Sequence, residues 1–170
     1  MKQITVSAAV ILRTNPQTHK KEILATQRGY GDFKGGWEFP GGKIESGETP
    51  EECIVREIRE ELATVVKAEK ILGVVEYDYP AFHLTMHCIL CSVVSGDLKL
   101  LEHEDAKWVT LETLYSLNWL PADRLILDRL LSILLSFIIF WECFKSFVLL
   151  KFCCHFFYFF FQLFFYTVGA

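Results

Sequence analysis

Three glutamates on one predicted helix have the type and spacing to collect divalent cations. Glu57, Glu60 and Glu61 stand at positions i, i+3 and i+4, and residues with this spacing share one side of an α-helix. Adjacent carboxylates repel one another, and a hard cation with oxygen ligands removes that cost. Magnesium in particular adds substrate phosphates to its shell. The pattern therefore indicates a polyphosphate site, and a solvated acidic helix face is the alternative.

The sequence around these glutamates predicts where the helix begins and which side it buries. Thr49 suits the N-cap, Pro50 suits the first helical position, and Glu52 completes a capping box. The apolar residues that follow share an arc of about 100°, beside the arc of the glutamates. The expected buried face consists of Ile54, Val55, Ile58 and Leu62.

A glycine-rich turn precedes this helix. Residues 35–42 read Gly-Gly-Trp-Glu-Phe-Pro-Gly-Gly. Glycine permits positive φ angles and lets the backbone approach a ligand closely. Gly-Gly pairs also mark ordinary turns, so the turn gains its meaning from the acidic helix beside it.

Turn and helix together resemble the Nudix box, Gly-x5-Glu-x7-Arg-Glu-hydrophobic-x-Glu-Glu. The flanking residues 37–45, Trp-Glu-Phe-Pro-Gly-Gly-Lys-Ile-Glu, are similar to the MutT branch, the nucleotide-pool sanitising enzymes. The resemblance covers about residues 3–130 and implies an α/β fold, the Nudix α/β/α sandwich with a mixed β-sheet. The matching box residues are Gly42, Glu48, Arg56, Glu57, Ile58, Glu60 and Glu61.

The chain departs from the box at its end. The family has glycine followed by an aliphatic residue there, and this chain has Ala63 and Thr64. The family glycine would lie just past the helix, where a left-handed residue is common. Alanine in that conformation costs about 1 kcal/mol, so we expect a weakened helix cap and untouched metal ligands.

The resemblance also implies roles. Arg56 is expected to point away from the acidic flank and to orient the loop through an ion pair with Glu48. A further carboxylate from another loop is common in the MutT branch; Glu102 fits that position, with Glu104 as the fallback and a plain loop acid as the alternative. Magnesium is the expected cofactor, with manganese as a substitute, and which glutamate acts as general base stays open. The expected metal ligands are Glu57, Glu60, Glu61, Glu102 and the backbone carbonyl of Gly41.

Substrate contacts are expected near the first strands, the Glu-Phe-Pro stretch and the last helix. Asp123 follows Leu-Pro-Ala and also suits the N-cap of that helix, and Phe39 also suits a core position. The expected substrate-binding residues are Arg28, Glu38, Phe39, Gly41, Gly42 and Asp123.

The implied activity is that of a magnesium-dependent pyrophosphohydrolase. It cuts a (deoxy)nucleoside triphosphate to the monophosphate and pyrophosphate, with 8-oxo-dGTP as the first substrate expected. A pyrimidine nucleotide such as CTP is the second. A non-catalytic nucleotide-binding module is the alternative from another class, and the complete set of box carboxylates argues against it.

Apolar and β-branched runs predict the other elements. Strands are expected at residues 4–12, 22–27, 71–79, 82–94 and 106–110. A polar loop is expected at 29–37, a short helix at 111–117, and a last helix from residue 122. This alternation predicts a mixed sheet between helices.

The chain has two compositions, which divide it into a domain at 1–130 and a hydrophobic tail at 131–170. The tail holds 12 of the 15 phenylalanines and three charged residues. A membrane-spanning helix needs about 20 apolar residues, and polar residues interrupt each window of that length. A membrane anchor, extra core and read-through of T-rich DNA are the three interpretations, and we favour read-through.

Charge and cysteine usage limit partners and location. A net charge of −4 without a basic stripe argues against nucleic acid. No disulfide framework is suggested, so the cytoplasm is the expected location, with membrane association only through the tail. The start of the chain predicts a strand, not a signal peptide. Cys88-x-x-Cys91 suggests zinc, yet no second pair follows. The sequence leaves the oligomeric state open.

Truncation after Leu130 tests the two-part division. The shortened protein is expected to stay soluble and to keep the hydrolytic activity of the full chain, because the predicted site lies entirely before this point. Expression yield and turnover of both forms measure this. An insoluble or inactive shortened protein would show that the tail is needed.

Overall fold

The computed structural model describes residues 1–131 of the 170-residue chain. The predictions for the tail therefore lie, apart from residue 131, outside the described residues. A helix over residues 121–131 follows the last named element. In chain order the elements are β1 (Lys2–Thr14), β2 (Lys21–Gln27), β3 (Trp37–Glu38), β4 (Gly41–Lys43), α1 (Pro50–Leu62), β5 (Val65–Asp78), β6 (Phe82–Ser95), β7 (Asp105–Thr110) and the 3-10 helix η1 (Leu114–Ser116).

Strand β1 organises a mixed sheet with the order β3-β2-β1-β6-β5, to which β4 and β7 add by pairing with β1 and β2. It runs parallel to β6 over residues 2–11. Over residues 12–14 it pairs antiparallel with β2, and the two strands form a hairpin. Over residues 6–8 the same edge of β1 pairs with β4 instead. Between the two pairings the Ala9 N–H donates to the Pro40 carbonyl at 2.8 Å. The sheet therefore splits at this point, where residues 39–40 connect β3 to β4.

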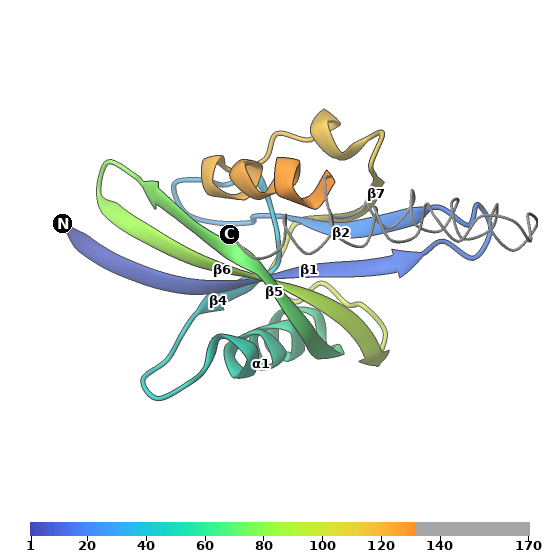
Figure 1. The fold of residues 1–170 in the computed structure, drawn as a ribbon, viewed down its shortest axis with the longest axis horizontal. Coiled ribbons are helices and arrows are strands. Elements are labelled where there is room, and N and C mark those ends of the chain that lie inside the picture. The colour runs from blue at the N-terminus through green and yellow to red at the C-terminus, as the bar shows by residue number, and fades with distance from the viewer. Residues whose placement is uncertain (132–170) are drawn as a thin grey trace, which may run out of the picture. The chain divides into compact units, whose positions relative to one another are not determined.

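Helices cover both faces of the sheet. Figure 1 shows α1 on one side and the helix over 121–131 on the other. The predicted α/β/α sandwich with a mixed sheet is confirmed. In the described part of the chain, no helix is long and apolar enough to cross a membrane.

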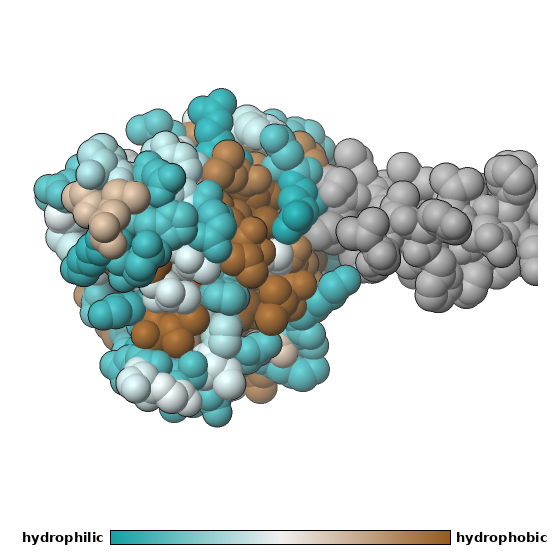
Figure 2. Space-filling view, turned by 60° about the vertical axis from the view of Figure 1, so that its left-hand side comes forward, coloured by the Kyte–Doolittle hydropathy of each residue, from teal (hydrophilic) through white to brown (hydrophobic). Residues whose placement is uncertain are grey.

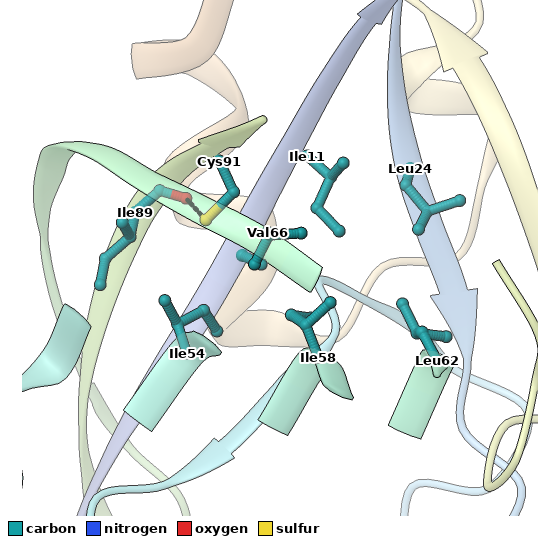
Figure 3. Close-up of a cluster of buried hydrophobic side chains, with 9 residues drawn as sticks. Ile11, Leu24, Ile54, Ile58, Leu62, Val66, Ile89 and Cys91 are labelled. Atoms are coloured by element: carbon teal, nitrogen blue, oxygen red, sulfur yellow. Dashed lines mark hydrogen bonds between the residues drawn. The ribbon is translucent and has the colours of Figure 1, made fainter. Parts of the chain in front are cut away.

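The apolar arc of α1 packs on the sheet as the periodicity predicts. Figure 3 shows three α1 side chains pointing at residues of β1, β2, β5 and β6. Val55 is only partly buried against this cluster. The labelled members are Ile11, Leu24, Ile54, Ile58, Leu62, Val66, Ile89 and Cys91.

Local signals fix both ends of α1. The Thr49 hydroxyl accepts the Glu52 N–H, and the Glu52 carboxylate accepts the Thr49 N–H, so the predicted capping box is confirmed. Ala63 follows the helix with φ 49° and ψ 32°, the left-handed conformation that the family glycine predicted. The strain expected at this alanine is therefore present.

Element boundaries differ from the sequence predictions, most of them by one or two residues, and the strands β3 and β4 were not predicted. Strand β5 begins at Val65, six residues before the predicted 71, because charged residues of a partly exposed strand hid its start. The predicted helix at 111–117 is one 3-10 turn. The last helix begins at residue 121, so Asp123 lies inside it and the N-cap interpretation is wrong.

Strand β5 is an edge strand with an irregular register. Its pairing with β6 shifts at three places, between Val65 and Val66, Ala68 and Lys70, and Ile71 and Gly73. Side chains such as Ile71 and Val74 are exposed. Figure 2 shows apolar patches within a mostly hydrophilic surface on the face turned to the viewer.

Replacement of Ala63 by glycine is expected to raise the free energy of unfolding by about 0.5 kcal/mol. Relief of about 1–2 kcal/mol of left-handed strain outweighs about 0.4–1 kcal/mol lost to a more flexible unfolded chain. Urea denaturation measures the change. The control is Ala106→Gly in the extended strand β7, which is expected to destabilise. A less stable Ala63→Gly protein would contradict the assigned strain.

Candidate active site

A cavity of about 400 Å³ lies beside the split in the sheet. Its floor includes the alternate β1 residues Ile4, Val6 and Ala8, whereas Ala9 and Ile11 belong to the core that α1 covers. Glu57 and Glu61 nevertheless reach the cavity from α1. Of the predicted site residues, it brings together Arg28, Glu38, Phe39, Gly41, Gly42, Glu57, Glu61, Glu102 and Asp123.

Glu61 is held by the backbone of the glycine turn. Its Oε2 accepts the Gly41 N–H at 3.1 Å. Gly41 has φ 149°, and a Cβ there would lie 2.2 Å from the Ser7 carbonyl oxygen. Burial raises the pKa of Glu61 to about 7, and the nearby carboxylates add to the rise while His103 opposes it. The buried carboxylate therefore lacks sufficient positive charge around it.

Glu57 lies directly against Gly42. A Cβ added at Gly42 would stand 2.4 Å from the carboxyl carbon of Glu57. Any side chain at this position would displace the carboxylate, so the second glycine of the turn keeps space for Glu57 at the cavity wall.

Arg56 links the loop to the acidic helix, and the prediction that it points away from the carboxylates is wrong. The predicted pair with Glu48 is confirmed, with Nη2 and Oε2 2.8 Å apart. The same guanidinium also reaches Glu57 at 2.8 Å and Glu60 at 3.2 Å through Nη1. The planar fork allows one cation to serve several acids. Hydrogen bonds from Arg56 hold the pKa of Glu48 down at about 2.

Glu60 does not join the other two glutamates at the cavity. Its side chain is 58% exposed and contacts Arg56. Within residues 1–131, no group of three or more histidine, cysteine, aspartate or glutamate side chains is arranged to hold a metal ion. The predicted convergence of three carboxylates is therefore not formed here, and the ligand role of Glu60 stays a prediction.

The donor chemistry of the cavity nevertheless suits a hard divalent cation. Glu57, Glu61 and Glu102 line it, and carboxylate oxygens are the ligands that magnesium and manganese prefer. Burial and neighbouring acids raise the pKa of Glu61, and a nearby cation would oppose both effects because it favours the charged carboxylate.

Glu102 and Glu104, the two candidates for the additional metal ligand, have different surroundings. Glu102 lines the cavity. Glu104 instead pairs with Lys34, whose Nζ lies 2.8 Å from Oε1. Glu102 is therefore the better placed of the two for a metal.

Asp123 connects the last helix to the Glu-Phe-Pro stretch. Its Oδ1 accepts the Phe39 N–H at 2.8 Å. Burial raises the pKa of Asp123 to about 7. Phe39 packs against Trp119 with ring centroids 4.7 Å apart, and it is both a core residue and a lining residue. Asp123 therefore lines the cavity with a carboxyl group whose protonated form is favoured by burial.

Arg28 is tied down by Glu38, with Nε and Oε1 3.1 Å apart. Its guanidinium also lies over the ring of Tyr30. Among the lining residues, Arg28 and Lys43 are the two cationic side chains, and Lys43 was not predicted.

One wall of the cavity is aromatic, and it was not predicted from the sequence. Phe33 lies 5.0 Å from Tyr79, and Tyr79 stacks on Phe82 at 4.8 Å between centroids. The Tyr79 hydroxyl also accepts the Ala122 N–H at 3.4 Å. The turn at Pro80, flanked by aromatic residues, was the available signal. Planar rings of this kind stack on nucleobases.

Within residues 1–131, Cys88 and Cys91 belong to no group of three or more side chains that could hold a metal ion. Cys88 and Cys91 are buried free thiols, and each contacts a backbone carbonyl of its own strand. Burial raises the pKa of both thiols to about 12.

The family follows from comparison with known proteins. A family model described as NUDIX domain matches residues 4–130. The chain therefore belongs to the Nudix family, whose members are hydrolases acting on phosphoanhydride bonds, use divalent metal ions and bind nucleotide substrates.

Individual relatives narrow this to the MutT-like branch. The chain is 30% identical over 131 residues to an 8-oxo-dGTP diphosphatase of Escherichia coli, with 76% of this chain and 98% of the relative covered. It is 29% identical to a CTP pyrophosphohydrolase of the same organism, with 78% and 95% covered. A MutT Nudix hydrolase from Burkholderia pseudomallei has a similar structure, with a TM-score of 0.64, 27% identity, and 76% and 98% covered.

The raised pKa of Asp123 predicts a pH-dependent stability. Between its ordinary value of 3.8 and about 7, the folded chain keeps a proton that the unfolded chain has lost. The free energy of unfolding therefore falls as pH rises through this window. Asp123→Asn removes this contribution and keeps an oxygen for the Phe39 N–H.

Urea denaturation at pH 5 and pH 8 measures the effect. The quantity compared is the free energy of unfolding of Asp123→Asn minus that of the parent protein. This difference is expected to be higher at pH 8 than at pH 5, by on the order of 1 kcal/mol or more. The exposed Asp97→Asn variant is the control. An equal stability difference at both pH values would contradict the assignment.

Proposed function

We propose that this chain hydrolyses a (deoxy)nucleoside triphosphate to the monophosphate and pyrophosphate with magnesium, and that an oxidised purine nucleotide such as 8-oxo-dGTP is its preferred substrate. The observation that carries the proposal is a single cavity that joins the Glu57 and Glu61 carboxylates to an aromatic wall and the buried Asp123. One part of this cavity suits metal-bound phosphates, and the other suits a planar base.

The carboxylates of this chain would hold the cation. The oxygen ligands would come from Glu57, Glu61 and Glu102. The backbone carbonyl of Gly41, also a predicted ligand, belongs to the glycine-rich turn whose N–H contacts Glu61. When bound, magnesium offsets the negative charge of the polyphosphate and acidifies an attacking water. Because burial favours the protonated form of Glu61, cation uptake is expected to release a proton from it.

Other residues keep these ligands in place. Arg56 fixes the loop through Glu48 and holds Glu57 at 2.8 Å. The Gly41 N–H restrains Glu61. Proton transfer from the attacking water needs a carboxylate that metal does not fully occupy, and Glu57, Glu60 and Glu61 remain the candidates.

Base selection is assigned to the far wall. Phe33, Tyr79 and Phe82 offer stacking surfaces, and Asp123 offers a carboxyl that donates or accepts according to its protonation. Similarity to an 8-oxo-dGTP diphosphatase over nearly its whole length supports the oxidised purine. The comparable similarity to a CTP pyrophosphohydrolase makes CTP the second candidate.

A nucleotide panel tests the substrate. Pyrophosphate release is measured with magnesium on 8-oxo-dGTP, dGTP, CTP, dCTP and ADP-ribose at matched concentrations. The largest kcat/KM is expected for 8-oxo-dGTP. A largest value for CTP would favour the second candidate, and no release from any nucleotide with magnesium or manganese would overturn the proposed activity.

Glu61→Gln separates chemistry from folding. The amide oxygen still accepts the Gly41 N–H, so the variant is expected to keep its fold, but it loses the charge that holds a cation. We expect turnover at least a hundredfold lower, with an unchanged circular dichroism spectrum. Glu51→Gln, in the first turn of α1 and away from the cavity, is the matched control. Full activity in folded Glu61→Gln would contradict the assigned metal site.

A further inference from the structure

The loop that carries Glu102 is attached to the site by its backbone on both sides. Before it, the Leu101 N–H donates to the Glu61 carbonyl at 2.9 Å, at the end of α1. After it, the Glu104 N–H donates to the Gln27 carbonyl at 3.0 Å, at the end of β2. Glu102 and His103 thus form a two-residue bridge between these attachments.

The two residues of this bridge have opposite surroundings. Glu102 is exposed and lines the cavity. The His103 side chain is only 6% exposed and does not line the cavity, and its Nε2 lies 3.7 Å from Glu38 Oε1. Glu38 is itself held by Arg28. His103 therefore lies beneath the loop, against a fixed carboxylate.

The burial of this imidazole has a cost that packing alone does not explain. Its Nδ1 is buried without a hydrogen-bond partner among the described residues, and it is the one such side-chain atom among them. Leaving a buried polar atom unsatisfied costs about 1–3 kcal/mol. An aliphatic residue of similar size would fill the space without that cost, so packing alone gives no reason for an imidazole here.

Polarity is useful here because the surroundings are acidic. Glu38 lies within ion-pair distance, and Glu61 interacts electrostatically with the imidazole. The contact of the ring with Glu38 is a restraint on His103, and His103 is the chain neighbour of Glu102. Groups that orient metal ligands without touching the metal commonly change metal affinity when they are replaced.

We propose that His103 is a positioning residue, which acts through its contact with Glu38 to hold the Glu102 carboxylate at the cavity that Glu57 and Glu61 share. This inference rests on the proposed metal-dependent hydrolysis for its functional meaning. It concerns a residue outside the Nudix box, and the imidazole itself touches neither substrate nor cation.

Three variants and one control test it. His103→Leu fills the space without a polar atom, His103→Gln carries an amide at about the reach of Nε2, and His103→Asn carries one at about the reach of Nδ1. Leu100→Gln, an exposed neutral change in the same loop, is the control. Calorimetric titration with manganese alone measures metal affinity, and kcat and KM are measured separately.

His103→Leu is expected to match or exceed the parent in melting temperature and to bind manganese about tenfold more weakly or worse. Its kcat should fall more than its KM changes. His103→Gln should recover most of the affinity, and Leu100→Gln should behave as the parent. This combination distinguishes positioning from packing, because a packing role predicts lost stability and no rescue by glutamine.

Unchanged manganese affinity in folded His103→Leu would overturn the inference. If that variant does not fold, equal affinity in His103→Gln and His103→Asn would overturn it, and higher affinity in His103→Gln would support it. Failure of the proposed function would look different from failure of this inference, because the parent protein itself would then neither bind manganese nor hydrolyse a nucleotide.

Discussion

Repulsion among carboxylates is the constraint on which this site depends. Glu57, Glu61 and Glu102 line one cavity, and burial makes the charge on Glu61 especially unfavourable. Two contacts limit the repulsion. The Arg56 guanidinium pairs with Glu57, and the Gly41 N–H donates to Glu61. Neither neutralises the cavity fully. The repulsion that remains is the same feature on which the proposed metal binding rests.

The sheet topology explains how Glu57 and Glu61 of α1 reach a cavity that is also lined by Ile4, Val6 and Ala8 of β1. Strand β1 pairs with β4 along one stretch and with β2 along the next, and residues 39–40 connect β3 to β4 where the pairing changes. Gly41 and Gly42 of β4 carry no side chain that would collide with Ser7 or Glu57. Two neighbouring arcs of α1 therefore have different surroundings. Ile58 packs in the core, and Glu61, one turn further on, lines the cavity.

The parts of the molecule that the sequence predicted are those with local determinants. The capping box of α1, its buried arc and the Arg56–Glu48 pair lie within a few residues of one another or follow the helical repeat. The direction of the Arg56 fork depends on the side-chain conformations of Glu57 and Glu60, which spacing does not fix. The aromatic wall needs Phe33 from a loop to meet Tyr79 from a hairpin, and only the folded sheet brings them together.

The irregular edge of β5 has a consequence for self-association. An exposed edge strand offers unpaired backbone groups to strands of other molecules, and regular, flat edges are the most hazardous. Here three register shifts twist the edge, and charged residues such as Lys67, Glu69 and Lys70 stand along it. Continuation of the sheet into a neighbouring molecule is thereby disfavoured, even though Ile71 and Val74 expose apolar surface on the same strand.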